Sequence, residues 1–586
     1  MAFWTPKLDI ETRDDGTIVL RQRERLEPYL ETLADYIDHW ADAAPDRIWL
    51  ARRGADGCWK SVCYGEARDQ ARALGAGLLN LGLSKTRPLL ILSENSLEHG
   101  LLGLACAYVG IPYSPITPAY SLVSEDHAKL KDIDALLEPG AVFADNGSQF
   151  ERAMKAIHSP RCTIINCREL LPGAVSFESL LETDPAPAAA ARARVGPETV
   201  LKYMFTSGST GSPKAVINTN HMICANQAMI RDCYRFLVDE PPVVLDWAPW
   251  NHTAAGNKVS YMVLTNGGSY YIDDGKPVPG KFDETIENLR GLACTWYFNV
   301  PAGYDRLVEA LETDAALAQT FFSRLRMLFY AGAGMAQHTW DRLAEIGRQT
   351  TGKDVLIATG LGATETAPFA LAWTEIETKA GNLGLPVREL SMKLVPIEDK
   401  LEVRFKGPSI TPGYFKEPDK TREVFDEEGY YRMGDALRPA DPEDLSRGFY
   451  FDGRVAENFK LSTGTWVAVG AVRSELVDGL GGLARDAVIV GENRKELGAL
   501  LWLSESAQSM DKETLRQALA ERLKKASVAA TGSASRVTRV SFLATDPSFD
   551  RGELTEKGSL NQRALRSHNG DLIESLYAGS ADSIIV

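Results

Sequence analysis

Segments with helical and strand-like patterns alternate along the chain from residue 64 onward, and this alternation limits the possible folds more than any other feature. An apolar run at 88–92 predicts a buried strand, 96–109 predicts a helix capped at Asn95-Ser96, and 111–116 predicts the next strand. Strands that alternate with helices are typical of parallel sheets with crossover helices. The sequence therefore predicts an α/β fold with mostly parallel sheets.

The length and the charge of the chain narrow its class. A chain of 586 residues is too long to fold around a single hydrophobic core, so two or more domains are expected. Apolar residues make up 44% and charged residues 24%, which is the composition of a globular protein. The formal charge of −15 argues against general binding to nucleic acid or to an anionic membrane. Small molecules are the expected partners.

The cysteines and the N-terminal segment bear on the compartment. Eight cysteines show neither metal-ligand spacing nor a disulfide framework, which favours reduced thiols. The N-terminal residues lack the basic start and apolar region of a signal peptide. The longest apolar run, Leu101 to Ile111, is too short to span a bilayer. We therefore expect a soluble cytoplasmic protein.

A run of hydroxyls and glycines at 204–216 has the composition of a phosphate-binding loop. Gly208 and Gly211 can turn their backbone N–H groups inward, and Lys214 adds a mobile positive charge. The short side chains that can donate hydrogen bonds are Thr206, Ser207, Ser209, Thr210 and Ser212. A P-loop would need Gly-Lys-Ser/Thr, but Pro213 separates the last glycine from the lysine. A flexible linker is the alternative, yet apolar strand-like segments flank the run on both sides.

Two later segments predict buried parallel strands that end in small residues. These are 325–334, ending in Ala-Gly-Ala-Gly, and 355–360, ending in Thr-Gly. Ligands bind beyond the carboxyl ends of such strands. By contrast, 184–194 is rich in proline and alanine and predicts a surface connection within the large domain.

The last part of the chain changes pattern. After residue 460, strand-like and helical segments follow as strand, strand, helix and strand, at 487–491, 497–503, 512–526 and 537–543. This order on a short span predicts a compact α+β unit. We therefore predict a multi-layer N-terminal α/β domain over 1–453 and a small, mobile C-terminal α+β domain over 454–586.

Five motifs in order resemble those of the AMP-forming acyl-CoA synthetases, adenylation domains and luciferases, which form one superfamily. They are Phe205-Thr-Ser-Gly-Ser-Thr-Gly-Ser-Pro-Lys214, Gly360-Leu-Gly-Ala-Thr-Glu-Thr366, Tyr431-Arg-Met-Gly-Asp435, Gly453-Arg-Val-Ala-Glu-Asn-Phe-Lys460 and Leu554-Thr-Glu-Lys-Gly-Ser-Leu-Asn-Gln-Arg563. The sequences of residues 451–467, 554–563 and 249–253 together resemble those of one branch, the long feruloyl-CoA synthases. That resemblance covers nearly the whole chain.

The resemblance implies where ATP, magnesium and coenzyme A would bind. Thr364 matches a phosphate-contacting hydroxyl, and Glu365 matches the carboxylate that holds Mg²⁺, for which a helix N-terminal charge is the plain alternative. Asp435 matches the ribose ligand. The remaining matched residues are Thr206, Ser207, Gly208, Ser209, Thr210, Gly211 and Lys214 in the loop, Gly332, Ala333 and Gly334 beside adenine, Gly360, Leu361, Gly362 and Ala363 before Thr364, and Arg454, Lys460 and Gly464 after Asp435.

The same resemblance places the acid beside a turn that follows a strand at residue 243. His252 could simply cap the helix that comes after it, but in the superfamily a histidine or aromatic residue at this position lies at the mouth of the acyl pocket. The other predicted wall residues are Trp250, Ala254, Ala255, Gly256 and Tyr261.

The chain departs from the superfamily at two positions. The hinge motif usually carries Asp or Lys where this chain has Ala456, and the late motif usually ends Gly-Lys where this chain has Lys557-Gly558-Ser559. Both departures match the usual sequences of these motifs in the feruloyl-CoA synthase branch. We therefore expect Lys557 to be the adenylation lysine, with another cation as the alternative.

The expected activity has two steps. An aryl-acrylic acid of feruloyl type would be joined to AMP from MgATP, with Lys214, Thr364, Glu365 and Lys557 as catalytic residues, and the acyl group would then pass to coenzyme A past Gly464. The alternatives are a ligase for benzoates or fatty acids, an adenylation domain that loads a carrier protein, and a nucleotide-binding module without activity. A monomer or a homodimer is expected.

Overall fold

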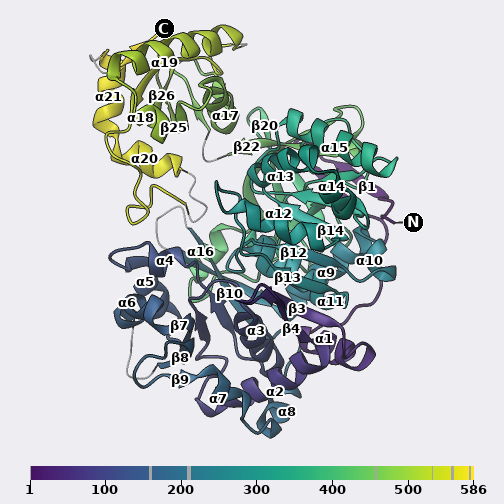
Figure 1. Cartoon of the computed structure of the whole chain (residues 1–586). Coiled ribbons are helices and arrows are strands. Elements are labelled where there is room, and N and C mark those ends of the chain that lie inside the picture. The colour runs from purple at the N-terminus through teal and green to yellow at the C-terminus, as the bar shows by residue number, and fades with distance from the viewer. Residues whose placement is uncertain are drawn as a thin grey trace.

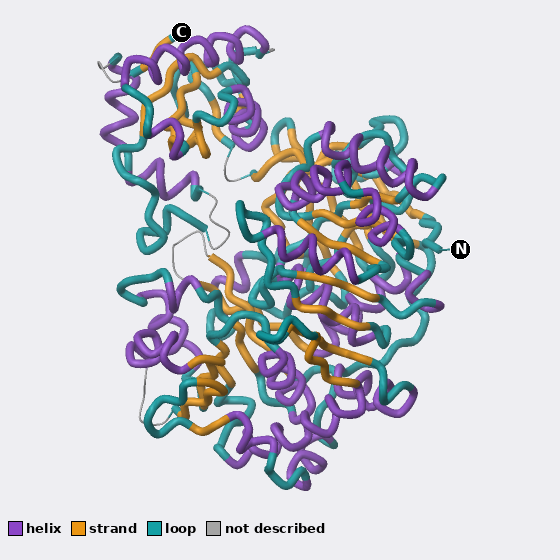
Figure 2. The backbone as a smooth tube through the Cα atoms, in the orientation of Figure 1, coloured by secondary structure: helices purple, strands orange, loops and turns teal. Residues whose placement is uncertain are grey.

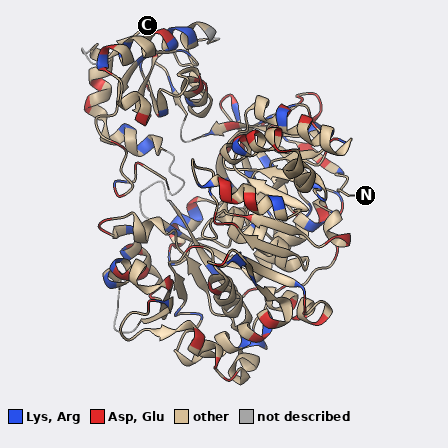
Figure 3. Ribbon diagram, in the orientation of Figure 1, with Lys and Arg blue, Asp and Glu red and all other residues tan. Residues whose placement is uncertain are grey.

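The structure is a computed structural model that describes residues 2–157, 162–207, 213–455, 458–530, 532–555, 560–579 and 583–586. A large N-terminal unit holds most of the helices and sheets, and a smaller C-terminal unit lies apart from it at the top of Figure 1. Charged residues of both signs are spread over the helices of both units, as Figure 3 shows. Strands form the interior of each unit and helices cover them (Figure 2).

Two sheets of the large unit are mainly parallel. The seven-stranded sheet is parallel except for its β10–β11 edge, and its order is β11 (Pro213–Thr219), β10 (Val200–Ser207), β6 (Tyr113–Pro115), β5 (Leu89–Ile91), β7 (Ala141–Asn146), β8 (Thr163–Arg168) and β9 (Val175–Ser176). The four-stranded sheet is parallel except for β3–β4, in the order β12 (Val243–Asp246), β13 (Ser269–Ile272), β3 (Ile48–Arg53) and β4 (Trp59–Cys63). The predicted parallel α/β architecture is confirmed.

A third sheet is fully parallel and carries the two small-residue ends that the sequence predicts. It consists of β14 (Trp296–Asn299), β15 (Met327–Tyr330) and β16 (Leu356–Ala358). All of its residues are buried. Because β15 and β16 run in the same direction, their carboxyl ends open side by side at residues 331 and 359.

Helices cover these sheets. They are α1 (Leu33–Ala43), α2 (Tyr64–Asn80), α3 (Leu97–Val109), α4 (Ala119–Leu122), α5 (Ala128–Leu137), α6 (Gly147–Ile157), α7 (Phe177–Leu181), α8 (Ala186–Arg192), α9 (Asn220–Cys233), α10 (Phe236–Asp239), α11 (Ser260–Thr265), α12 (Phe282–Gly291), α13 (Pro301–Thr313), α14 (Ala315–Phe322), α15 (Gln337–Thr351) and α16 (Pro418–Glu423). The predicted cap of α3 is confirmed, since Ser96 Oγ accepts a hydrogen bond from the backbone N of His99 at 3.0 Å.

The segment 184–194 is mostly exposed, as predicted for a surface connection, but it is not irregular. Residues 186–192 form α8, and Ala188 and Ala191 on it are buried. Consecutive alanines have the highest helix propensity, and prolines fit the first turn of a helix because they lack only an N–H that would stay unpaired there. The alanines therefore form a helix that packs on the large unit.

The sequence patterns did not predict an antiparallel sheet of six strands. Its order is β1 (Leu8–Thr12), β2 (Ile18–Gln22), β19 (Ser391–Ile397), β20 (Lys400–Lys406), β21 (Tyr431–Pro439) and β22 (Phe449–Arg454). Leu20 of β2 pairs with Met392 of β19, so the first strands of the chain join strands made much later. This sheet carries Asp435 on β21.

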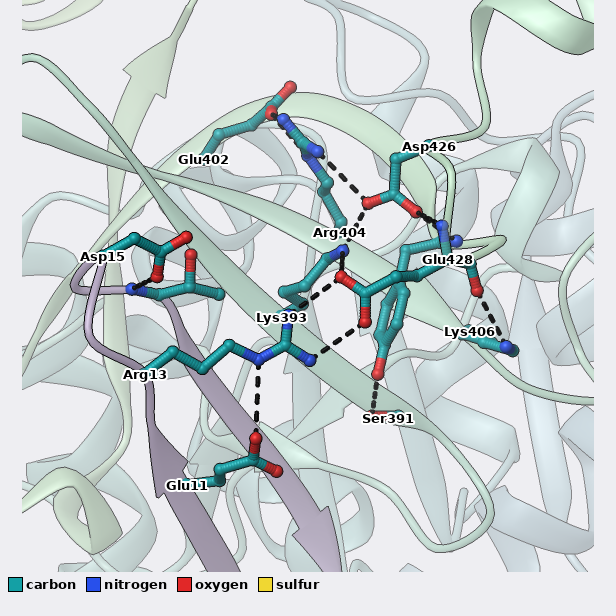
Figure 4. Close-up of polar contacts among 12 residues, drawn as sticks. Glu11, Arg13, Asp15, Ser391, Lys393, Glu402, Arg404, Lys406, Asp426 and Glu428 are labelled. Carbon is teal, nitrogen blue, oxygen red and sulfur yellow. Dashed lines mark hydrogen bonds and ion pairs between the residues drawn. The ribbon is translucent and has the colours of Figure 1, made fainter.

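A network of ion pairs ties the N-terminal strands to the loop before β21 (Figure 4). Lys393 Nζ lies 2.5 Å from Asp426 Oδ2 and 2.9 Å from Glu428 Oε1, and Arg404 Nη1 lies 3.1 Å from Asp426. Arg13, just after β1, reaches Glu428 at 2.8 Å. The Asp426 side chain is only 1% exposed, so its charge is held by these partners rather than by water.

The C-terminal unit has a hydrophobic core of its own, which begins at Phe459. Its strands are β23 (Phe459–Lys460), β24 (Trp466–Val467), β25 (Ala484–Val490), β26 (Leu497–Leu503), β27 (Val537–Phe542) and β28 (Ile584–Ile585), and its helices are α17 (Val469–Gly479), α18 (Glu505–Gln508), α19 (Lys512–Ala529), α20 (Gln562–His568) and α21 (Gly570–Ala578). The predicted strands and helix at 487–543 are confirmed. The boundary at 453/454 and the mobility of this unit stay predictions.

One loop of the C-terminal unit touches the large unit. Phe549 packs on Tyr120 with ring centroids 5.5 Å apart, and Lys129 Nζ donates a hydrogen bond to the Phe549 carbonyl at 3.3 Å. The Glu125 backbone N also donates to Asp550 Oδ2 at 3.1 Å. This contact precedes the segment that carries Lys557.

Candidate functional site

The predicted phosphate loop connects two paired strands. Thr206 on β10 is opposite Lys214 on β11 in the antiparallel register, and Ser207 is opposite Pro213. Gly208, Ser209, Thr210, Gly211 and Ser212 lie outside the described residues. The two described ends of the loop are therefore held together by the hairpin.

Tyr414 joins the loop lysine to the predicted magnesium ligand. Lys214 Nζ lies 5.1 Å from the centroid of the Tyr414 ring, and the Tyr414 hydroxyl donates to Glu365 Oε1 at 3.0 Å. The backbone fixes this arrangement, because Tyr414 forms a β-bridge with Val216 of β11 and the Thr411 backbone N donates to the Glu365 carbonyl at 2.8 Å. Lys214 and Glu365, distant in sequence, therefore belong to one site.

The tyrosines beside Glu365 stay protonated. Burial, followed by the charge of Glu365, raises the pKa of both the Tyr414 and the Tyr431 hydroxyls well above the usual range. A protonated hydroxyl can donate a hydrogen bond to a carboxylate. Because the hydroxyl is uncharged, it neither repels the carboxylate nor competes with it for a cation. Glu365 itself is 7% exposed, on a short 3₁₀ turn at Thr364–Thr366.

The surroundings of Glu365 fit Mg²⁺ in that they offer one carboxylate ligand. Among the described residues, no group of three or more His, Cys, Asp or Glu side chains could hold a metal ion. Mg²⁺ needs no such group, because it is commonly held by one or two carboxylates together with substrate phosphates and water. Glu365 with one oxygen bound to Tyr414 could supply one such ligand.

Asp435 lies opposite Arg454 in the six-stranded sheet. The Asp435 carboxylate on β21 is 5% exposed, and Arg454 Nε on β22 lies 3.2 Å from its Oδ1. The arginine side chain is itself 60% exposed. The residue matched to the ribose ligand and the one matched to a second ribose or phosphate contact are thus neighbours.

Gly332 after β15 and Gly362 after β16 are required by the backbone. Gly332 has a φ of +91°, which residues with a side chain rarely adopt, and Gly332, Ala333 and Gly334 form an exposed turn. A Cβ on Gly362 would lie 1.3 Å from the Pro368 carbonyl oxygen. Gly360, Leu361, Gly362 and Ala363 lead from β16 into Thr364, so the carboxyl end of β16 leads to Glu365.

A π-helical turn, η1 (Ala254–Val259), carries most of the predicted acid-binding wall. Trp250, Gly256 and Tyr261 line a cavity of about 50 Å³ together with His99, Tyr113 and Lys202. That volume holds a few water molecules, whereas pockets for drug-sized ligands measure several hundred Å³. Ala255 is fully buried and Ala254 is half-buried. The assignment of these residues to the acid-binding wall stays a prediction.

His252 caps the turn that follows it. Its Nδ1 accepts a hydrogen bond from the Ala254 backbone N at 3.3 Å, and its carbonyl accepts one from the Gly256 backbone N at 2.8 Å. This is the structural alternative that the sequence offered for His252. Contact between His252 and a substrate stays a prediction.

Two predicted residues of the C-terminal unit, Lys460 and Gly464, belong to the described part of the chain. Lys460 Nζ forms an ion pair with Glu398 at 2.7 Å. Gly464 lies in the turn between β23 and β24 with a φ of +82° and with no heavy atom within 4 Å of an added Cβ. Its conformation alone therefore accounts for a glycine there. Lys557, like Ala456, lies outside the described residues.

Sequence reasoning missed Tyr414 as a site residue and used Tyr431 only as part of a motif. Neither carries a charge, and an aromatic residue in an apolar stretch usually packs in a core. One available signal was Gly413 before Tyr414, since its φ of +137° is open to glycine only. The missed residues are those that bring the motifs together.

The remaining predictions concern redox state and membranes. All eight cysteines are free thiols, as expected. Within the described ranges, none of the helices has both the length and the apolar character that a bilayer crossing requires.

Family models match most of the chain. A model described as AMP-binding enzyme matches residues 37–415, and one described as AMP-binding enzyme C-terminal domain matches residues 471–581. The first match alone covers more than half of the sequence.

Individual relatives are distant. A carboxylic acid reductase from Mycobacterium marinum (strain ATCC BAA-535 / M) is 24% identical over 583 residues, which cover 90% of this chain and 47% of that protein. The 4-coumarate–CoA ligase 3 of Arabidopsis thaliana is 25% identical over 392 residues, covering 64% of this chain and 66% of that protein. The chain thus spans about half to two thirds of the length of these relatives.

A solved structure has the same fold. ATP-bound MatB from Rhodopseudomonas palustris is similar with a TM-score of 0.68 at 21% identity, covering 92% of this chain and 99% of that one. At this identity the likeness bears on the fold alone.

Proposed function

The chain belongs to the family of AMP-binding enzymes, and from this membership we propose that it activates a carboxylic acid with ATP and transfers the acyl group to coenzyme A. The observation that carries the proposal is the link between Lys214 and Glu365 through Tyr414. It places a cation and a carboxylate together where the loop 206–214 ends.

In the first step a carboxylate oxygen of the acid bonds to the α-phosphorus of ATP, and the bond from that phosphorus to pyrophosphate breaks. Charge spreads over the phosphate oxygens, so catalysis depends on positioning and on charge stabilisation. Lys214 and Lys557 would supply positive charge, and Thr364 would donate a hydrogen bond. Asp435 would accept hydrogen bonds from the ribose hydroxyls.

Glu365 would hold Mg²⁺, which offsets the negative charge of the phosphates when it is bound. Tyr414 keeps the carboxylate oriented by its hydrogen bond to Oε1. The protonated hydroxyl leaves the charge of Glu365 intact, so the residue remains a ligand for a hard cation.

In the second step the thiol sulfur of coenzyme A bonds to the acyl carbon, the carbon–oxygen bond to AMP breaks, and the thiol proton is lost. We propose that the C-terminal unit changes its contact with the large unit between the steps. The Phe549 contact on Tyr120 would then open and close, with the domain boundary near residues 453 and 454.

For the acid we propose the aryl-acrylic class, of feruloyl type. Two observations support it: the feruloyl-CoA synthase wording of residues 451–467, and the similarity to a 4-coumarate–CoA ligase. We further propose a cytoplasmic monomer or homodimer. Free thiols in all eight cysteines suit a reducing compartment.

A second candidate differs in the acceptor. The similarity to a carboxylic acid reductase spans 90% of this chain, which favours a shared adenylation step but leaves open a carrier thiol in place of coenzyme A. Both candidates predict release of pyrophosphate.

Two assays test the proposal. ATP–pyrophosphate exchange with a panel of cinnamates, benzoates and fatty acids measures the first step. Absence of exchange with every acid would favour the alternative of a nucleotide-binding module without activity. AMP and thioester formation on addition of coenzyme A measures the second step. Exchange without any acyl-CoA product would favour the carrier-linked alternative.

A further inference from the structure

One buried lysine beside the site has no hydrogen-bond partner. Lys258 on η1 is 3% exposed, and within the described part of the chain its Nζ makes no hydrogen bond. Four aromatic rings surround the amine instead, with Nζ-to-centroid distances of 3.1 Å to Phe329, 4.6 Å to Phe369, 5.6 Å to Tyr234 and 5.8 Å to Trp296. We call these four rings the aromatic cage.

A second buried lysine provides a comparison. Lys202 is on β10, and its Nζ donates a hydrogen bond to the Gly256 carbonyl at 2.6 Å. Burial lowers the pKa of both lysines well below the usual value. Lys202 is thus buried with a backbone partner, whereas Lys258 is buried among rings alone.

The aromatic cage adjoins the candidate site. Phe329 is on β15, just before the turn at 331–334, and a Cβ on Gly360 would lie 3.7 Å from its ring. Phe369 follows the 3₁₀ turn that carries Glu365, and Lys258 is on the same helical turn as Ala254, Ala255 and Gly256. One aromatic ring therefore separates the Lys258 amine from the segment that leads to Thr364 and Glu365.

The chemistry of the Lys258 amine indicates which kind of hydrogen-bond partner it lacks. Burying a polar group without a partner costs several times more than burying a methyl group gains, so methionine or leucine would fill this space at lower cost. The amine of a lysine donates hydrogen bonds, so it can bind an oxygen. Aromatic walls with one unsatisfied amine at the end suit a planar ring that carries an oxygen.

We propose that Lys258 binds a ring oxygen at the far end of the acid, opposite the carboxylate that is activated. The inference rests on the proposed function and deepens it, because it assigns recognition of the acid class to one residue. The long, flexible stem of lysine can move aside for a ring and still bring Nζ to its hydroxyl. Lys258 is then a specificity residue for oxygenated aryl acids.

The first test uses the unaltered protein. ATP–pyrophosphate exchange is measured with 4-hydroxycinnamate and with 4-methylcinnamate, in which a methyl group of similar size replaces the hydroxyl. A site built to hydrogen-bond a hydroxyl rejects the analogue that lacks it, so kcat/KM should favour the hydroxyl by at least about tenfold. Equal values for the two acids, or exchange only with acids that have no ring oxygen, would overturn the inference.

The second test compares two matched variants. In Lys258→Met the preference for the hydroxyl should fall to about one, with kcat/KM for 4-methylcinnamate retained within about threefold. Lys202→Met removes a buried lysine with a backbone partner, so it should lower exchange with both acids by the same factor. A hydroxyl preference that survives in Lys258→Met contradicts the proposal.

The two failures can be told apart. Exchange with any acid supports the proposed function, and only the ratio between the paired acids tests Lys258. If Lys258→Met does not fold, the hydroxyl-to-methyl ratio of the unaltered protein still decides the matter.

Discussion

The hydroxyl of Tyr414 donates a hydrogen bond to Oε1 of Glu365 at 3.0 Å, while the ring of Tyr414 lies beside Lys214. One uncharged side chain thus contacts both the cationic and the anionic member of the site. Because the tyrosine stays protonated, it orients the carboxylate without altering its charge.

Glu365→Gln should lower the rate of adenylate formation by about two to three orders of magnitude, because the amide has the shape of the carboxylate but cannot hold Mg²⁺. The measurement is ATP–pyrophosphate exchange at saturating magnesium, with the melting temperature as a check on folding. The exposed helix residue Glu287 provides a control, since Glu287→Gln should exchange normally. Near-normal exchange in Glu365→Gln would remove this residue from the mechanism.

Tyr414→Phe should reduce exchange about tenfold, because Glu365 loses one oriented donor but keeps its charge. A double-mutant cycle with Glu365→Gln measures the coupling. If the hydroxyl acts through Glu365, the second substitution adds little to the first. Fully additive losses would show that the Tyr414 hydroxyl acts on another group.

Asp246 should make stability depend on pH. Its carboxyl is buried, with Oδ1 accepting from the Ala248 backbone N at 2.9 Å and Oδ2 accepting from the Tyr270 hydroxyl at 3.0 Å. Burial raises its pKa from 3.8 to about 7. The folded state therefore binds this proton more tightly than the unfolded state, so the contribution to stability is complete below pH 3.8 and is lost as pH rises to about 7.

Asp246→Asn removes that titration. In urea unfolding between pH 5 and 7, the unaltered protein should lose up to about 1.4 kcal/mol per pH unit from this group, and the variant should show a flatter profile. Identical slopes would mean that water or a rearrangement keeps Asp246 charged in the folded state.

The ion-pair network around Asp426 should stabilise the six-stranded sheet. Asp426→Asn leaves Lys393 and Arg404 with one fewer buried anion and should cost about 3 kcal/mol in unfolding free energy. Glu11→Gln, on the exposed pair beside Arg13, should change it by less than about 0.5 kcal/mol. A similar small loss in both variants would assign the sheet's stability to its apolar packing.

Acid should weaken the same network. Burial alone would raise the pKa of Asp426, but hydrogen bonds from Lys393, the Tyr430 backbone and Arg404 outweigh it and lower the value. Arg13 and then Lys393 hold the pKa of Glu428 at about 2. These contributions are present above the unfolded pKa values and are lost as pH falls through the folded ones. In urea unfolding, the further loss of unfolding free energy below pH 4 should therefore be smaller in Asp426→Asn than in the unaltered protein.

Lys557→Ala should slow adenylate formation by roughly two to three orders of magnitude, as expected for the loss of one preorganised charged donor. Thiolysis of separately supplied acyl-adenylate should continue, since that step uses another arrangement of the C-terminal unit. The nearby Arg563, on α20, is the comparison. Normal adenylation in Lys557→Ala with a loss in Arg563→Ala would move the role to the arginine.

The sequence predicted those parts of the fold whose signal is local. Apolar runs bounded by small residues marked β15 and β16, and their common direction placed residues 331 and 359 at one edge. The motifs named Lys214, Glu365 and Asp435 separately. Tyr414, which brings the first two together, went unnoticed because its role depends on a β-bridge to Val216 that no periodicity reveals.

The antiparallel sheet could not be predicted for a related reason. The pairing of Leu20 with Met392 joins strands far apart in the chain, and an isolated short strand has no pattern that identifies its partner. Lys258 illustrates a different limit. A single lysine between apolar residues gives no indication that four rings will surround it.

The pairing of β2 with β19 also sets an order of events on the ribosome. Strands β1 and β2 leave the exit tunnel well before β19, so the strand that covers the edge of β2 is made only after Met392 is added. At ordinary rates of synthesis this takes on the order of tens of seconds. For that time the hairpin presents an unpaired edge, so a nascent chain should depend on chaperones until the sheet that carries Asp435 closes.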